Sequence, residues 1–110
     1  MTVPSVKENL SQWSLVANDS WIKGQRFQLA KGAQTIGRST DATLTFPSKH
    51  LSRLHAEITV SEDFLFVTDL KSANGTFVNG KLINSAKIKP GDHIRFDQFS
   101  FVVEGPQNHA

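Results

Sequence analysis

Short runs of alternating apolar and polar residues, separated by turn sequences, constrain the fold of this chain most strongly. Ala56, Ile58 and Val60 alternate with polar residues, so their side chains would point to one face of an extended strand. The same pattern recurs in residues 13–17, 27–29, 44–46, 94–96 and 99–103. Residues 64–67 are apolar throughout, which predicts a strand covered on both faces.

Turn sequences divide these runs at short intervals. Asn79-Gly80 predicts a two-residue hairpin, because both residues accept a positive φ. Pro90-Gly91-Asp92 is also typical of a turn. About ten or eleven short strands spaced in this way predict an all-β fold, either a sandwich or a barrel.

The length of 110 residues corresponds to one domain. We expect an N-terminal arm at residues 1–11, a folded domain at 12–104, and a C-terminal tail or the start of a linker at 105–110. The sequence has no apolar run near 18 residues and no secretory signal pattern, so we expect no insertion into a membrane. The absence of cysteine suits a reducing compartment, and we predict a cytoplasmic location.

The chemistry of the chain predicts a binding protein rather than an enzyme. There is no cysteine, no serine in a nucleophile motif and no glycine-rich loop that opens a helix. His50 and His55 have no carboxylate at zinc-site spacing, so we expect no metal site and no cofactor. The net charge of +2 is too small to predict general binding to nucleic acid.

Three segments carry the polar residues of a candidate site: residues 36–38, 51–55 and 72–80. If their loops meet at one end of the fold, Arg38, Ser52, Arg53 and Asn74 can converge. Two guanidinium groups and a hydroxyl suit a phosphate, which offers several acceptor oxygens. A carboxamide both donates and accepts, which suits the backbone of an extended peptide.

Four motifs occur in order along the chain: Gly37-Arg38, Ser52-Arg53-Leu54-His55, Asn74-Gly75-Thr76 and Asn79-Gly80. In this order they resemble the forkhead-associated (FHA) domain family. The resemblance extends over residues 13–103. It implies a two-sheet antiparallel β-sandwich of the FHA/SMAD-like type and a role as a signalling adaptor that binds phosphothreonine peptides or proteins.

The resemblance also implies a role for each motif residue. Arg38 would bind the phosphate, Ser52 would donate its hydroxyl to it, and Arg53 would add a second polar contact. Asn74 would bond the peptide backbone beside the phosphothreonine. The resemblance implies an architectural role for four further residues: Gly37, His55, Gly75 and Thr76.

Ala73 departs from the family pattern, because many relatives have a threonine there whose hydroxyl reaches the phosphate. The Ala73 N–H would still be able to donate to the ligand. His50 lies in a loop that, in relatives, helps to read the third residue after the phosphothreonine, so Lys49 and His50 predict a preference for an acidic residue. A phosphate-independent protein-binding module on the same sandwich is the alternative function, and the oligomeric state stays open.

Overall fold

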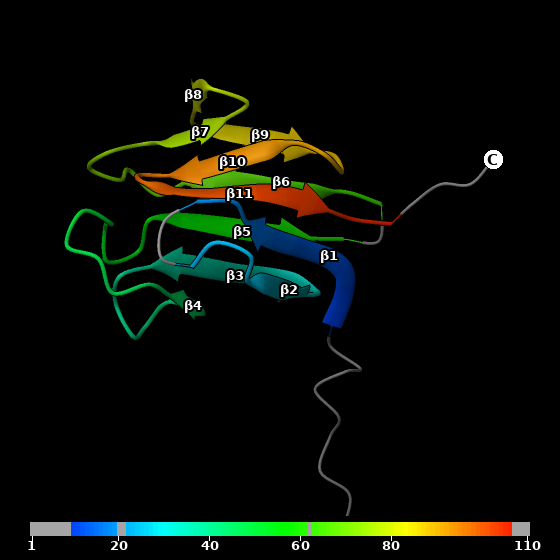
Figure 1. Cartoon of the computed structure of the whole chain (residues 1–110), viewed down its shortest axis with the longest axis horizontal. Coiled ribbons are helices and arrows are strands. Elements are labelled where there is room, and N and C mark those ends of the chain that lie inside the picture. The colour runs from blue at the N-terminus through cyan, green and yellow to red at the C-terminus, as the bar shows by residue number, and fades with distance from the viewer. Residues whose placement is uncertain (1–9, 20–21, 62, 107–110) are drawn as a thin grey trace, which may run out of the picture.

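Two facing sheets contain the eleven β-strands of the computed structural model, which describes residues 10–19, 22–61 and 63–106 (Figure 1). The first sheet has the order β2 (Arg26–Ala30), β1 (Leu10–Ala17), β11 (Phe99–Glu104), β10 (His93–Phe96), β7 (Thr76–Val78), β8 (Lys81–Ile83). The second has the order β4 (Leu44–Thr45), β3 (Gly32–Gly37), β5 (Ala56–Val60), β6 (Leu65–Asp69), β9 (Ser85–Ile88).

This architecture confirms the predicted β-sandwich of ten or eleven strands. One pair departs from the antiparallel prediction, because β3 and β4 run parallel. Strand β1 begins at Leu10, two residues before the predicted start of the domain, and Leu10 pairs with Ala30 of β2. Residues 1–9 and 107–110, which make up most of the predicted arm and tail, lie outside the described residues. None of the residues described forms a helix long and apolar enough to cross a membrane.

The core lies between the sheets and follows the alternation of the sequence. Trp13, Leu15 and Ala17 of β1 are all buried, as are the alternate residues of β5 and β11. Phenylalanine rings fill the centre, with Phe46 stacked on Phe99 at a centroid distance of 5.3 Å. Burial of such a side chain stabilises the fold by about 2 kcal/mol.

Strand β6 corrects the prediction that residues 64–67 are covered on both faces. Leu65 and Val67 are fully buried, but Phe66 is 38% exposed. Its side chain lies on the outer face of the second sheet, opposite Thr59 of β5 and Lys87 of β9. The apolar run therefore predicts the strand but not a second covered face, because none of the residues that the structure describes forms a further layer on the outer face of this sheet.

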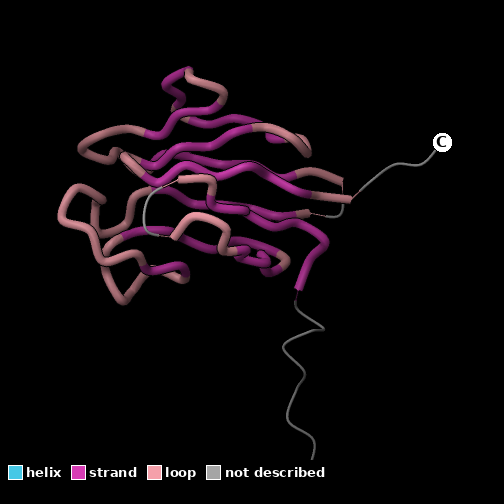
Figure 2. The backbone as a smooth tube through the Cα atoms, viewed as in Figure 1, coloured by secondary structure: helices cyan, strands magenta, loops and turns pink. Residues whose placement is uncertain are grey.

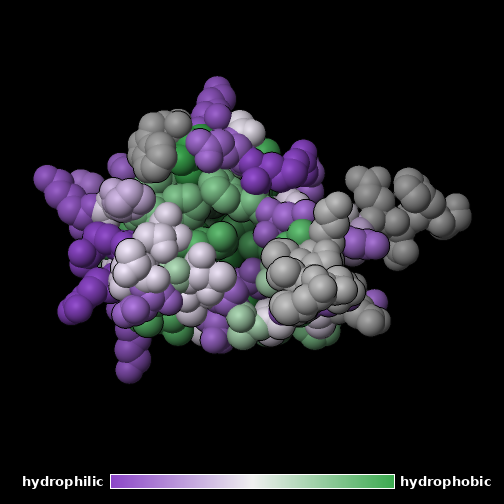
Figure 3. Space-filling view, turned by 90° about the horizontal axis from the view of Figure 1, so that it is seen from below, coloured by the Kyte–Doolittle hydropathy of each residue, from purple (hydrophilic) through white to green (hydrophobic). Residues whose placement is uncertain are grey.

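The loops that carry the predicted site residues lie at one end of the sandwich, on the left in Figure 2. They follow β3, precede β5 and connect β6 to β7. Strand β1 begins and β11 ends at the opposite end (Figure 1). Strands β2 and β4 form the lower edge of the two sheets, and apolar surface is visible between polar side chains when the molecule is viewed from that side (Figure 3).

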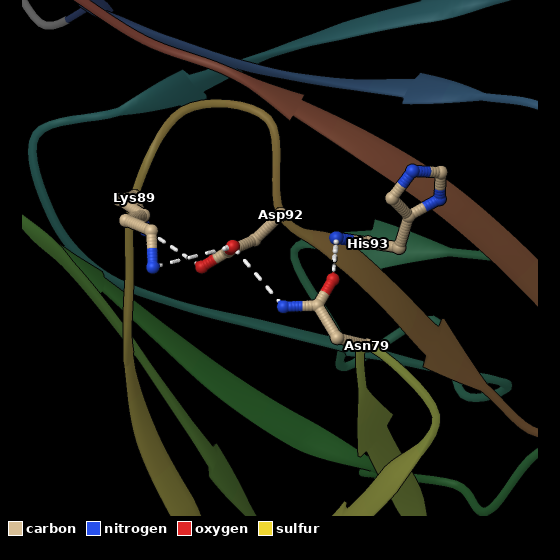
Figure 4. Close-up of polar contacts among 4 residues, drawn as sticks. All are labelled: Asn79, Lys89, Asp92 and His93. Carbon is tan, nitrogen blue, oxygen red and sulfur yellow. Dashed lines mark hydrogen bonds and ion pairs between the residues drawn. The ribbon is translucent and has the colours of Figure 1, made fainter.

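The hairpin between β7 and β8 is tied to the turn before β10 by one side chain, that of Asn79 (Figure 4). Asn79 and Gly80 have φ values of 50° and 85°, as a two-residue hairpin requires. The Asn79 amide donates to Asp92 Oδ1 at 3.1 Å, and its oxygen accepts from the His93 N–H at 2.9 Å. Asp92 Oδ2 accepts the Lys89 N–H at 3.0 Å, so one carboxylate and one amide fix two adjacent turns.

Substitution of Asn79 by glycine should lower the free energy of unfolding by about 1–3 kcal/mol, because glycine tolerates the positive φ but loses both amide hydrogen bonds. Asn84→Gly is the matched control, since the exposed Asn84 side chain makes no hydrogen bond to the described residues. Asn84→Gly should lower the free energy of unfolding by only about 0.5–1 kcal/mol. Urea denaturation measures both variants, and equal losses would contradict a role for the amide.

Candidate functional site

The end of β3 lies directly against the loop that precedes β5. The Arg38 N–H donates to the Ser52 carbonyl at 2.9 Å, and the Ser39 N–H donates to the Arg53 carbonyl at 3.1 Å. A Cβ on Gly37 would lie 2.1 Å from the Arg53 oxygen. Only glycine permits this approach, so Gly37 determines where Arg38 stands relative to Ser52.

Two buried side chains anchor the loop before β5. Phe46 and Leu51 insert into the core, and the Phe46 N–H donates to the Gly37 carbonyl at 2.9 Å. Arg38 Nε donates to the Leu51 carbonyl at 3.1 Å. Because Leu51 points inward, the residues around it, His50, Ser52 and Arg53, remain partly or fully exposed.

His55 connects this loop to the loop between β6 and β7. Its side chain is fully buried and lies edge-on to Phe96 at a centroid distance of 5.9 Å. Nδ1 accepts the Ser52 N–H at 3.3 Å, so Nε2 carries the hydrogen that it donates to the Gly75 carbonyl at 2.8 Å. One imidazole ring thus fixes the distance between two of the three motifs.

Asp69, at the end of β6, organises the loop that carries Asn74. Its carboxylate accepts from the Ser72 hydroxyl at 2.6 Å and from the Thr76 hydroxyl at 2.7 Å. The Ser72 oxygen in turn accepts the Gly75 N–H at 2.9 Å. Burial acts to raise the pKa of Asp69, but the hydrogen bonds that its carboxylate accepts from the Ser72 and Thr76 hydroxyls and from the Ser72 N–H outweigh burial and lower this pKa below its usual value.

Direct hydrogen bonds join the loop before β5 to the loop after β6. The Ala73 N–H donates to Ser52 Oγ at 2.9 Å, and Asn74 Nδ2 donates to the His50 carbonyl at 2.6 Å. The expectation that the Ala73 N–H stays available to a ligand is therefore wrong for this structure. Because Ser52 Oγ accepts this bond, its own hydrogen remains to be donated outward.

The structure thus brings all six predicted binding residues to one end of the sandwich. Ser52 is partly exposed, and the other five are exposed: Arg38, His50, Arg53, Ala73 and Asn74. The Arg53 side chain makes no hydrogen bond to the described residues. In that part of the chain no three His, Cys, Asp or Glu side chains are grouped as metal ligands would be. The surface offers guanidinium and hydroxyl donors that suit an oxyanion.

Sequence reasoning did not identify three residues that support this surface: Leu51, Asp69 and Ser72. Leu51 begins the candidate segment 51–55, but its inward orientation and its carbonyl bond to Arg38 depend on tertiary packing. Asp69 and Ser72 are three residues apart, a spacing at which an Asp side chain often accepts from a backbone N–H. That spacing is the one local signal that could have indicated the hydrogen bonds between Asp69 and Ser72.

Comparison with known proteins gives the family. The family model described as "FHA domain" matches residues 34–97, which include every motif discussed above. The chain belongs to the FHA domain family. Its FHA domain is similar to a solved structure from a structural and functional analysis of phosphothreonine-dependent FHA domain interactions, with a TM-score of 0.79 and 31% identity. That match covers 87% of this chain and 98% of the other.

Two curated relatives show the same similarity. FHA domain-containing protein FhaA of Mycobacterium tuberculosis is 35% identical over 80 residues, which is 73% of this chain and 15% of the relative. The oxoglutarate dehydrogenase inhibitor of Corynebacterium efficiens is 36% identical over 84 residues, which is 76% of this chain and 59% of the relative. The matched FHA domain is therefore only part of each of these two proteins.

The stability of the FHA domain should decrease in acid partly through Asp69. Its pKa is lower in the folded chain than its ordinary value of 3.8. The stabilisation is therefore complete above that ordinary value and is lost as the pH falls through the folded value. The difference in free energy of unfolding between wild type and Asp69→Asn should be largest near pH 7 and shrink below about pH 4.

Urea denaturation across this pH range measures the difference. Asp63→Asn is the control, because the exposed Asp63 side chain makes no hydrogen bond to the described residues. The free energy of unfolding of Asp63→Asn should depend on pH in the same way as that of wild type. A constant difference between wild type and Asp69→Asn from pH 7 to about pH 3 would contradict the role of the ionised carboxylate.

Proposed function

We propose that this FHA domain binds a phosphothreonine segment of a partner protein, without catalysing a reaction. One observation supports the proposal most: hydrogen bonds between the loops link Arg38 to Ser52, Ala73 to Ser52 and Asn74 to His50, and so hold these residues at one exposed surface. The surface presents two guanidinium groups, a hydroxyl hydrogen and a carboxamide. A phosphate monoester carries close to two negative charges and several acceptor oxygens, and so matches these donors.

Each residue has a distinct role in this proposal. Arg38 is anchored through Nε, and its terminal nitrogens bind the phosphate. Ser52 donates its hydroxyl hydrogen to a phosphate oxygen, and Arg53 adds a second cation. Asn74 uses its Oδ1 and its second amide hydrogen for the peptide backbone, because one hydrogen is already given to the His50 carbonyl.

The comparisons support the ligand class. The similar solved FHA domain comes from work on interactions that depend on phosphothreonine, and one curated relative is named as an enzyme inhibitor. By analogy we propose that the domain acts as a signalling adaptor in the cytoplasm. The His50 carbonyl accepts from Asn74, and we propose that His50 and the preceding Lys49 favour an acidic residue three positions after the phosphothreonine.

Arg38→Ala should weaken binding of a phosphothreonine peptide by at least about 30-fold, which corresponds to about 2 kcal/mol. The reason is the loss of a charge-assisted contact to the phosphate. Isothermal titration calorimetry with a peptide selected from a phosphothreonine library measures the affinity. The unphosphorylated form of the same peptide should not bind measurably.

Arg26→Ala is the matched control for loss of a surface charge. Arg26 lies on β2 and forms an ion pair with Glu104, and neither residue belongs to the three motifs. The control should retain wild-type affinity. Equal binding of the phosphorylated and plain peptides would instead support the alternative, a phosphate-independent module on the same sandwich.

Ala73→Thr should strengthen phosphopeptide binding by about tenfold, because it adds a hydroxyl beside Ser52 that can donate to the phosphate. Ala73→Val has the same branched shape without the hydroxyl, and it should give no gain. Circular dichroism would establish that both variants are folded. Equal affinities of the threonine and valine variants would show that position 73 does not contact the phosphate through a hydroxyl.

A further inference from the structure

An exposed apolar surface lies on the outer face of the first sheet, on its edge strand β8. Leu82 is 67% exposed and is the most exposed large hydrophobic residue in the described part of the chain. It pairs directly with Phe77 of β7, so both side chains lie on the same face. We call Phe77 and Leu82 the apolar shelf.

The apolar shelf borders the loop that carries Asn74. A Cβ on Gly75 would lie 2.6 Å from Leu82 Cδ1 and 3.3 Å from Phe77 Cε1. Gly75 has a φ of +90°, which suits glycine, and the missing side chain lets Leu82 and Phe77 approach the loop. Strand β7 directly follows this loop, and β8 lies beside it at the upper edge of the first sheet in Figure 1.

Arg95 forms the opposite side of the shelf. Its guanidinium carbon lies 4.0 Å from the centroid of the Phe77 ring, and Nη1 donates to the Asp97 carbonyl at 2.7 Å. The guanidinium is thus fixed over the Phe77 ring and covers part of it. Leu82 is the part of the shelf that remains accessible to a ligand. An apolar surface of this kind, continuous with a polar binding loop, suits a ligand that has an apolar side chain near its charged group.

We propose that the apolar shelf binds an apolar side chain of the same phosphopeptide and so determines part of its sequence specificity. This inference rests on the proposed function. Standard bond lengths and the Gly75 contact place Leu82 Cδ1 at most about 8 Å from the Asn74 Cα. An extended peptide rises about 3.3 Å per residue, so the selected position lies two or three residues from the one that bonds Asn74.

The test is an oriented peptide library with one fixed phosphothreonine, applied to the wild-type protein and to two variants. Leu82→Gln removes the exposed part of the shelf at a position where 67% of the residue's surface is accessible to solvent. Phe66→Gln is the control, because Phe66 is an exposed hydrophobic residue on the outer face of the other sheet. Calorimetry with the best wild-type peptide then gives the affinities.

Wild type and Phe66→Gln should both select leucine, isoleucine, valine or phenylalanine at one flanking position. Leu82→Gln should lose this selection and bind the best peptide about five- to tenfold more weakly. If wild type selects no apolar residue, or if Leu82→Gln keeps the same apolar preference, the proposed role of the apolar shelf is wrong. Either result would leave phosphothreonine binding itself intact. Failure of every phosphothreonine peptide to bind wild type would overturn the proposed function and, with it, this inference.

Discussion

The buried imidazole of His55 is the interaction on which the arrangement of the site depends. It accepts a hydrogen bond from one loop and donates one to another, and both partners are backbone groups. The loop side chains are therefore free to face outward while the ring fixes the spacing of their backbones. Gly37 has a similar function between the end of β3 and the loop before β5. Because Gly37 has no side chain, its backbone can lie directly against the backbone of Arg53.

The fold could be predicted from the sequence because alternation and turn residues are local signals. The burial of Trp13, Leu15 and Ala17 follows from their spacing alone. The exposure of Phe66 does not, since an apolar run cannot show whether a further layer covers the outer face. The parallel pairing of β3 with β4 was also missed, because strand direction depends on the path of the intervening loop.

The sequence predicted that the candidate site residues converge at one end of the fold, but it did not predict the hydrogen bonds among them. The sequence motifs pointed to Ser52, Ala73 and Asn74 as candidate site residues. Only the three-dimensional arrangement shows that the Ala73 N–H already donates a hydrogen bond to Ser52 Oγ. The support given by Leu51 and Asp69 was missed for the same reason, because a hydrogen bond between loops depends on packing that no single segment encodes.

The hydrogen bonds that clamp the loop after β6 have a thermodynamic consequence. Asp69, Ser72 and Thr76 order this loop before any ligand arrives. Association therefore loses little backbone entropy, and the cost of adopting the bound conformation is met during folding. A preorganised surface of this kind favours rapid docking with little rearrangement, so the lifetime of a complex would depend mainly on how fast its few polar contacts break.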